Sequence, residues 1–189
     1  MLYYIELQPN ERPQYDQIPM KAQIREIYQV KFENLDGITF HRTPVTPYEK
    51  DFSVWETFDR WNQQFDLSNW HFFAAFDQGI PVAGAVLCCH TPGVNMLDGR
   101  DDLGVLWDLR VDPAYQRQGV AQKLFSMVKE KAVQLELKQL KIECQNNNVP
   151  ALHFYLKQGA QIGGVHQHAY DAQELWEEVQ ILLYLDLSK

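Results

Sequence analysis

The chain contains little cysteine, and the few cysteines it has exclude a disulfide-stapled or zinc-held fold. Only three occur in 189 residues, Cys88, Cys89 and Cys144. Neighbouring strand residues point to opposite faces, so Cys88 and Cys89 would rarely pair. His166 and His168 would share one strand face, but no carboxylate or cysteine accompanies them at metal-ligand spacing. We therefore expect reduced, buried thiols and no metal centre.

Long hydrophobic stretches are absent as well. No apolar run approaches the ~18 residues that a membrane-spanning helix needs. The first residues, MLYYIELQPNERP, lack the basic and apolar regions of a signal peptide. We expect no membrane span and a cytoplasmic location.

Basic residues are in deficit, which argues against nucleic acid as a partner. The formal net charge is −8, whereas phosphate backbones are bound by basic surfaces. The one net-basic stretch is residues 110–141, with seven Lys and Arg against three acidic residues. Such a segment in an acidic chain suits an anionic cofactor held beside a cationic substrate. Solvated helix faces would explain the same pattern.

Apolar side chains, by contrast, are plentiful. The hydrophobic fraction is 46%, enough for one well-packed core, so we expect a single domain over residues 1–189. Residues 2–7 alternate as a strand does, while residues 15–32 and 52–65 show the three-to-four-residue spacing of helices. Residues 38–41 form a short strand candidate. Pro44 and Pro47 predict an irregular segment over residues 42–50.

From residue 70 onward the pattern alternates between apolar and polar positions. It predicts strands at residues 70–76, 80–89, 105–111, 140–145, 160–166 and 178–187, and helices at residues 119–137 and 149–158. The last strand is apolar on both faces, which indicates a central place in a sheet. The polar residues 91–102 predict a mobile loop on the substrate side. An α/β fold of the α+β type follows, with a central mixed, mostly antiparallel sheet flanked by helices.

The stretch from Leu106 to Ala121 has the composition of an anion site. An apolar strand leads into a short loop and then a long amphipathic helix. Helix starts leave backbone N–H groups without partners, and these groups can bind a diphosphate. Gly119 and the small Ala121 let a ligand approach the backbone closely. A plain tight turn would explain a single glycine equally well.

Two motifs in combination are more specific. The pattern Gln116-x-x-Gly119-x-Ala121 opening a helix resembles motif A of the Gcn5-related N-acetyltransferase (GNAT) superfamily. About thirty residues later, Asn148-x-x-Ala151-x-x-Phe154-Tyr155 resembles the second signature of that family. The resemblance covers residues 70–187, which would form an acetyl-CoA-binding core. Residues 1–69 would then be the N-terminal, substrate-side portion.

The resemblance implies roles for individual residues. The backbone of Leu109, Arg110 and Val111 would contact the pantetheine arm of acetyl-CoA. The pyrophosphate would be held by the six residues Gln116, Arg117, Gln118, Gly119, Val120 and Ala121. Asn148 and Ala151 would complete the cofactor contacts, and Tyr155 would protonate the departing thiolate. A core tyrosine with a satisfied hydroxyl is the alternative for Tyr155.

A base must also take a proton from the attacking amine. Asp108 and Glu143 lie on neighbouring predicted strands, each on the face opposite its apolar neighbours. Two carboxylates near the cofactor could bind an ammonium group and relay its proton. Either of them could instead be an ordinary surface acid.

A narrower likeness concerns the substrate. Pro47-Tyr-Glu-Lys50, Gln145-Asn-Asn-Asn148 and Ile162-Gly-Gly164 resemble segments of streptothricin acetyltransferases. This predicts an enzyme that acetylates a primary amine of a small cationic substrate, with antibiotic resistance as one such role. The alternatives are a peptide or protein amine acetyltransferase and a non-catalytic acyl-CoA-binding module. An exposed edge strand could support a homodimer.

Overall fold

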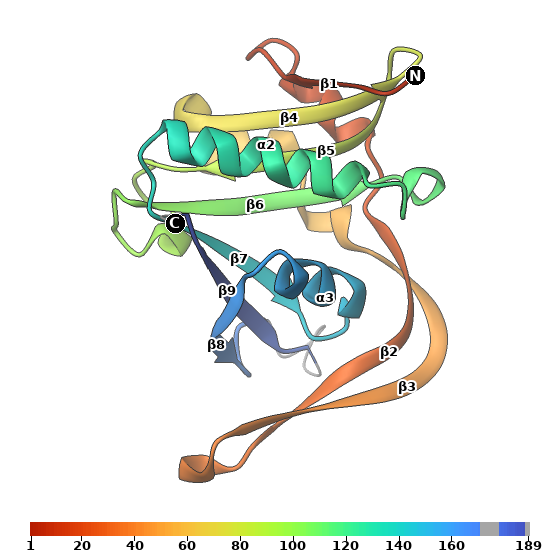
Figure 1. Cartoon of the computed structure of the whole chain (residues 1–189), viewed down its shortest axis with the longest axis vertical. Helices are drawn as coiled ribbons and strands as arrows, with labels where there is room; N and C mark the ends of the chain where they lie inside the picture. The colour runs from red at the N-terminus through yellow and green to blue at the C-terminus, as the bar shows by residue number, and fades with distance from the viewer. Residues whose placement is uncertain (171–177, 188–189) are drawn as a thin grey trace. The chain divides into compact units, whose positions relative to one another are not determined.

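The computed structural model describes residues 1–170 and 178–187, and Figure 1 labels the elements of that part of the chain. Its strands are β1 (Tyr3–Glu6), β2 (Lys21–Phe32), β3 (Ile38–Asp51), β4 (Trp70–Asp77), β5 (Ile80–Cys88), β6 (Leu103–Val111), β7 (Gln139–Gln145), β8 (Gln161–His166) and β9 (Gln180–Asp186). Its α-helices are α1 (Phe58–Gln64), α2 (Val120–Gln134) and α3 (Val149–Lys157). Short 3₁₀ turns connect them: η1 (Arg12–Gln17), η2 (Asn34–Asp36), η3 (Phe52–Trp55), η4 (Leu67–Asn69), η5 (Asn95–Leu97) and η6 (Pro113–Tyr115).

The architecture is mixed α/β, as the sequence predicts. Seven strands form one sheet in the order β1-β4-β5-β6-β7-β9-β8, and β2 and β3 form a separate two-stranded ribbon. The pairs β1–β4, β4–β5, β5–β6 and β8–β9 are antiparallel. The expectation of a central place for the last strand is confirmed, because β9 lies between β7 and β8.

The chain divides into two compact units, with one boundary inside β7. Unit 1 comprises Met1–Lys21, Asp51–Lys141 and Asp186–Lys189, and unit 2 comprises Ala22–Lys50 and Ile142–Leu185. Unit 1 therefore contains the predicted pyrophosphate loop and Asp108. Unit 2 contains Glu143 and the second signature, with Tyr155.

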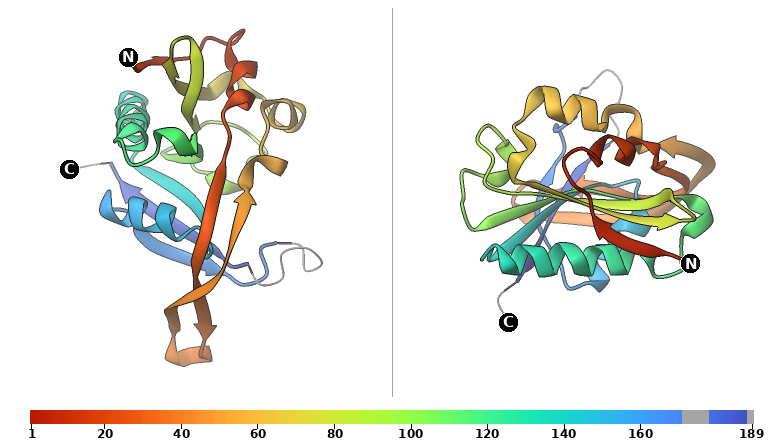
Figure 2. Two further views of the ribbon diagram at one scale, coloured as in Figure 1. Left: turned by 90° about the vertical axis from the view of Figure 1, so that its right-hand side faces the viewer. Right: turned by 90° about the horizontal axis from the view of Figure 1, so that it is seen from above.

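Unit 1 is layered. Helix α2 covers one face of its strands, and η1 and α1 cover the other face (Figure 2). The second interface is strongly aromatic, and burying these large side chains supplies much of the stabilising free energy of the unit. Its buried members are Leu7, Tyr15, Ile18, Trp61, Leu67, Trp70, Phe72, Ala74, Phe76, Val86, Cys88, Val94, Leu97 and Val105.

The predicted helix over residues 15–32 is wrong. Only η1 is helical there, and residues 21–32 form β2, which is part of the ribbon. The sequence from Ala22 to Phe32 also alternates between polar and apolar residues, apart from Glu26 and Ile27. Pairing with β3 selects this period of two over the helical spacing, because β-strand preference depends on tertiary context.

The predicted irregular segment over residues 42–50 is also wrong. It belongs to β3, which includes Pro44 and Pro47. A two-stranded ribbon has only edge strands, and an edge strand tolerates proline where its N–H would not face the partner strand. The predicted helix over residues 52–65 is shorter than expected, because residues 52–55 form η3 and α1 begins only after Thr57, whose side chain caps Arg60.

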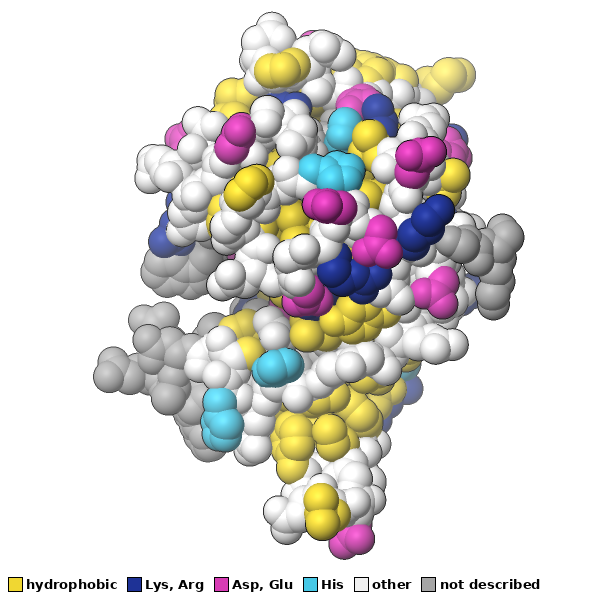
Figure 3. All heavy atoms as spheres, turned by 90° about the vertical axis from the view of Figure 1, so that its left-hand side faces the viewer, with side chains coloured by type: hydrophobic (Ala, Val, Ile, Leu, Met, Phe, Trp, Pro, Cys, Tyr) yellow, Lys and Arg dark blue, Asp and Glu magenta, His cyan; other side chains and the backbone are white. Residues whose placement is uncertain are grey.

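The far end of the ribbon is apolar and exposed. Phe32 and Ile38 flank η2, and Leu35 within η2 is fully exposed. Figure 3 shows apolar side chains on the surface at this end of the ribbon. Ile24 near its start is buried, and Tyr28 further along packs against Phe40 and His153.

Candidate active site

In unit 1, the turn before α2 presents the backbone that the sequence predicts. Gly119 is the N-cap residue of α2 and has a φ of 81°, and no side chain accepts a hydrogen bond from the first turn. Arg117 also has a positive φ, of 60°. Two left-handed residues separated by Gln118, together with an uncapped helix start, direct N–H groups outward, which suits a phosphate group.

Two glutamine side chains hold this turn in shape. Gln116 donates from Nε2 to the carbonyl of Val111 at 3.2 Å, and Gln118 donates from Nε2 to the carbonyl of Ala114 at 2.9 Å. Gln116, Arg117 and Gln118 are exposed, while Val120 is buried and anchors the helix. A Cβ added at Gly119 would have no neighbour within 4 Å. The turn therefore offers open backbone to a ligand, and these residues fit a diphosphate.

Strand β6 carries side chains with different surroundings. Leu109 and Val111 are half-buried, while Asp108 and Arg110 are buried. Val86 pairs with Asp108, but Leu87 pairs with Leu106, so Trp107 is an extra residue that forms a bulge. Bulges change the direction of side chains and backbone, and they are common beside active sites. The sequence does not reveal this bulge.

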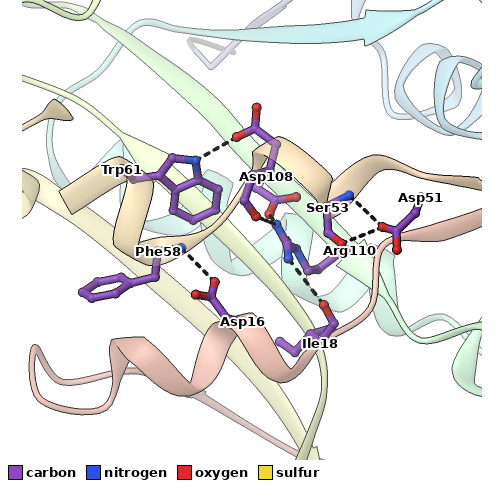
Figure 4. A network of polar contacts seen from close by, with 9 residues as sticks. Asp16, Ile18, Asp51, Ser53, Phe58, Trp61, Asp108 and Arg110 are labelled. Atoms are coloured by element: carbon purple, nitrogen blue, oxygen red, sulfur yellow. Dashed lines mark hydrogen bonds and ion pairs between the residues drawn. The ribbon is translucent and has the colours of Figure 1, made fainter. Parts of the chain in front are cut away.

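Asp108 forms a fully buried ion pair with Arg110 (Figure 4). The Nε of Arg110 donates to Oδ2 of Asp108 at 2.6 Å, and Nη2 donates to the same oxygen. Arg110 also donates to the carbonyls of Glu56, at 3.0 Å, and Ile18, at 3.4 Å. This guanidinium connects β6 to the segments around η1 and η3.

Aromatic rings complete the surroundings of this pair. The guanidinium carbon of Arg110 lies 4.9 Å from the ring centre of Tyr15 and 5.8 Å from that of Trp61. Burial raises the pKa of Asp108, and the Arg110 guanidinium opposes this shift. Burial alone would lower the pKa of Arg110, but its attraction to Asp108 raises it. Arg110 is therefore a permanent cation, and it holds one oxygen of the carboxylate.

Polar atoms near this pair lack partners. Within residues 1–170 and 178–187, the buried Asp108 Oδ1, Tyr15 hydroxyl and Trp107 Nε1 make no hydrogen bond of ordinary geometry, although the Tyr15 hydroxyl lies close enough to Asp108 to lower the pKa of its carboxyl group. A buried polar atom without a partner is costly, so a native structure usually supplies one, from water or a ligand. The surroundings of Asp108 thus retain capacity for hydrogen bonding.

In unit 2, α3 begins as the sequence predicts. Asn148 is its N-cap, with Oδ1 accepting from the N–H of Ala151 at 3.4 Å, and Pro150 stands in the first turn. This leaves the amide nitrogen of Asn148 as the group that could reach a ligand. Tyr155 is buried on the same helix, 6% exposed, with Phe154 packed against its ring.

Glu143 on β7 of unit 2 is not a surface acid. The hydroxyl of Tyr170 donates a short hydrogen bond to its Oε1. Burial raises the pKa of Glu143; Tyr170 opposes that shift, and nearby Glu178 adds to it. The sequence gives Tyr170 and Glu178 no role, because the two residues lie far from Glu143 along the chain.

The remaining candidates concern metals and thiols. Among the residues that the structure describes, no group of three or more His, Cys, Asp and Glu side chains could hold a metal ion. The expected common strand face of His166 and His168 is wrong, because β8 ends at His166 and His168 lies in the following turn. The cysteines are buried and unpaired, as expected, and burial raises the pKa of Cys88 to about 12.

Residues 90–101 line an open hollow of their own in unit 1. Lys141, whose side chain is 5% exposed, donates to both carboxylate oxygens of Asp98 at 2.9 Å. This buried ammonium fixes the loop to β7, so the loop has a defined conformation. In the described part of the chain, no helix is long and apolar enough to cross a membrane.

Comparison with known proteins agrees with this arrangement. The family model of the acetyltransferase (GNAT) family matches residues 23–160. A streptothricin acetyltransferase from Escherichia coli is 24% identical over 147 residues, which cover 78% of this chain and 74% of that protein.

Two solved structures share the fold. A nourseothricin acetyltransferase superposes with a TM-score of 0.79 at 21% identity, covering 99% of each chain. A Bacillus anthracis protein described as a candidate streptothricin acetyltransferase, solved with acetyl coenzyme A, superposes with a TM-score of 0.74 at 24% identity, covering 98% of this chain and 99% of that one. The chain belongs to the acetyltransferase (GNAT) family and is an acetyl-CoA-dependent N-acetyltransferase.

Proposed function

We propose that this enzyme transfers the acetyl group of acetyl-CoA to a primary amine of a small, positively charged substrate, of the class to which streptothricin belongs. The observation that supports this substrate class most is the buried carboxylate of Asp108. Arg110 occupies one of its oxygens, and the other lacks a hydrogen bond of ordinary geometry within the described residues, with the Tyr15 hydroxyl nearby. A substrate ammonium group would supply that donor, among aromatic rings that also favour cations.

The cofactor roles follow from the local structures. The turn formed by Gln116, Arg117, Gln118, Gly119, Val120 and Ala121 would bind the pyrophosphate through its N–H groups and the α2 dipole. The backbone of Leu109, Arg110 and Val111 would bind the pantetheine arm, together with Asn148 and Ala151.

The chemistry needs two proton transfers. The amine nitrogen attacks the thioester carbonyl, a C–N bond forms, and the C–S bond breaks. A carboxylate accepts the proton that the amine loses, and Tyr155 donates its phenolic proton to the sulfur of the departing thiolate. Tyr155 then regains a proton from solvent.

Two carboxylates could act as the base, and their surroundings differ. Burial raises the pKa of Asp108, and the permanent cation Arg110 opposes that rise. Glu143 has a raised pKa in a buried setting, which favours proton uptake. We propose Asp108 for binding the ammonium group and keep both Asp108 and Glu143 as proton acceptors.

A thiol-release assay with acetyl-CoA tests the proposal. The amines are streptothricin, lysine, polyamines, aminoglycosides and peptides, each with and without enzyme. We expect thiol release with at least one small cation and little with peptides. Release with peptides alone would favour a peptide or protein acetyltransferase. Tight binding of acetyl-CoA without release for any amine would favour a non-catalytic module.

We propose that residues 1–69 contribute the substrate side and residues 70–187 the cofactor core. We also propose that the enzyme works in the cytoplasm. Finally, we propose that it forms a homodimer through an edge strand. In the sheet order, β1 and β8 are the edges. Light scattering after gel filtration would measure the oligomeric state directly.

A further inference from the structure

A buried polar cluster in unit 2 is not used by the chemistry described above. It brings together side chains from four segments: Lys50 near the end of β3, Gln145 at the end of β7, Asn147 in the loop before α3, and Glu178 just before β9. Lys50 donates to Gln145 Oε1 at 3.2 Å and forms a short ion pair with Glu178 Oε1. Asn147 donates from Nδ2 to the same Glu178 oxygen at 3.0 Å.

Two acceptors in this cluster have no donor. Glu178 Oε2 and Asn147 Oδ1 are buried, and no residue in the described ranges donates to either of them. Asn147 is 4% exposed, and the side chain of Glu178 is 13% exposed. Both atoms can only accept, so the missing partner must be an N–H or O–H donor.

The neighbouring Asn146 shows what a purely structural asparagine looks like in the same loop. Its Nδ2 donates to the carbonyl of Tyr28 at 2.9 Å, and its Oδ1 accepts from the N–H of Val179 at 2.9 Å. Both ends of the Asn146 amide are therefore used. Asn147 uses only its donor, so the loop itself does not require the second acceptor.

The charges near these acceptors favour a cation. The Glu178 carboxylate raises the pKa of Glu143, and the Lys50 ammonium group opposes this effect. Tyr170 satisfies one oxygen of Glu143. One oxygen of Glu178 pairs with Lys50 and the other lacks a donor within the described residues, so an incoming donor that is positive gains more than a neutral one.

We propose that Glu178 and Asn147 bind an ammonium or guanidinium group of the acetyl-acceptor substrate through the oxygens Oε2 and Oδ1. This inference rests on the proposed function for the identity of the ligand as an acceptor amine. It assigns two specificity-determining residues outside the two GNAT signatures; Asn147 lies in the Gln145–Asn148 segment that resembles streptothricin acetyltransferases. The groups act by hydrogen bonding and charge, and no bond to carbon is made or broken there.

Binding measured without turnover tests the proposal. The probes are Nα-acetyl-lysine amide, which carries a side-chain ammonium group, and Nα-acetyl-norleucine amide, which carries a methyl group in its place. Calorimetric titration of the full chain with coenzyme A present gives the dissociation constants. We expect the wild-type protein to prefer the lysine probe by roughly tenfold or more, because a hydrogen bond to a charged group contributes about 1.5–3 kcal/mol.

The variants separate a binding role from a structural one. Glu178→Gln keeps the shape of the side chain and replaces one carboxylate oxygen with an N–H₂ group. The preference for the lysine probe over the norleucine probe should therefore fall to within about threefold. Asn147→Leu removes the second acceptor and should also reduce the preference for the lysine probe. Glu26→Gln is the control, since the same change at the exposed pair with Arg42 leaves the cluster intact. Melting temperatures of all four proteins establish that each one folds.

The outcomes are distinct. An unchanged preference in folded Glu178→Gln and Asn147→Leu, or no preference in the wild-type protein, would overturn the proposal. Where an accepted amine is found, its KM should rise about tenfold in Glu178→Gln with kcat little changed. If no amine is acetylated but the lysine probe still binds through Glu178, the proposed function fails and this site stands. If acetylation proceeds with unchanged KM, the site fails and the function stands.

Discussion

At the residue scale, the Asp108–Arg110 pair is a buried ion pair whose disruption should be costly. Both side chains are almost completely buried, at 2% and 1% exposure. Two buried charges lose the solvation of water, and only close pairing and further hydrogen bonds offset that loss. Arg110 has both, through Asp108, two carbonyls and two rings.

Breaking this pair should therefore destabilise the protein strongly. Arg110→Met leaves the Asp108 carboxylate buried without a counterion, and we expect the free energy of unfolding to fall by about 3–5 kcal/mol. Urea unfolding followed by fluorescence measures it. The double variant with Asp108→Asn should recover part of the loss. Additive losses in the double variant would contradict a direct pairing.

Tyr155 is the second residue-scale prediction. Tyr155→Phe removes the acidic hydroxyl and keeps the buried ring, so we expect kcat to fall on the order of 10²-fold, with the dissociation constant of acetyl-CoA within about twofold of wild type. Steady-state kinetics and titration with acetyl-CoA measure both. Tyr28→Phe, which loses only the 2.8 Å hydrogen bond to His153, is the control. Equal kcat in both variants would remove Tyr155 from the role.

The residues of the site are only partly readable from the sequence. The motifs identify Gly119, Asn148 and Tyr155, since each depends on a local backbone arrangement. The partner of Asp108 is two residues away on the same strand, so the spacing Asp108-x-Arg110 is a local signal for this pair. Tyr15 and Glu178 meet their partners only through the tertiary fold, and no local pattern could indicate them.

At the element scale, the turn into α2 makes the sharpest prediction. Gly119→Ala places a Cβ on a residue with a φ of 81° and on the open side of the turn. We expect a loss of about 1–2 kcal/mol in the free energy of unfolding from the left-handed backbone, together with a rise of about tenfold in the KM of acetyl-CoA. Unfolding and steady-state kinetics measure the two effects.

Gly79→Ala is the matched control for this turn. Gly79 has a φ of 84° in the β4–β5 hairpin of the same unit, also with nothing within 4 Å of an added Cβ. The Gly79→Ala variant should lose as much free energy of unfolding as Gly119→Ala and leave the KM of acetyl-CoA unchanged. A similar KM in both variants would mean that the α2 turn does not hold the cofactor.

The ribbon shows where element prediction failed and why. Residues 15–32 fit a helical and an alternating pattern at once, and local propensity does not decide between them. Their partner β3 was hidden because Pro44 and Pro47 argue against a strand. An edge position removes that objection, but edges are defined only by the assembled sheet. The later strands and helices were predictable because each shows a single clear period.

At the scale of the whole molecule, the buried Glu143 predicts a pH dependence of stability. Its pKa is raised above the ordinary value of 4.5, so the folded state binds the proton more tightly than the unfolded state. The contribution of Glu143 to the free energy of unfolding is then greatest below that value and decreases as the pH rises through the raised pKa. Glu143→Gln removes this titration.

Urea unfolding of both proteins from about pH 4 to about pH 8 measures the effect. The stability of the wild-type protein minus that of Glu143→Gln should decline with rising pH. Glu26→Gln gives the opposite sign as a control, because Arg42 lowers the pKa of Glu26 through a hydrogen bond. A difference that increases with pH for Glu143 would contradict its buried, proton-retaining state.

The overall class was predictable for a different reason than the site. Alternating strands and amphipathic helices from residue 70 onward each constrain the architecture independently, so errors in the first third left the fold class unchanged. The bulge at Trp107 and the cluster around Glu178 depend on register and on loops, which a sequence pattern does not define. The substrate depends on those features, so it is the least predictable property.

The most direct test of the central claim combines thiol release with mass spectrometry of the amine, using acetyl-CoA and streptothricin. The result we predict is release of one thiol for each acetyl group that appears on a primary amine of the substrate, with both signals strongly reduced in Tyr155→Phe. If neither streptothricin nor any other small cation gains an acetyl group while acetyl-CoA is bound, the account of this enzyme as a cationic-amine acetyltransferase is contradicted.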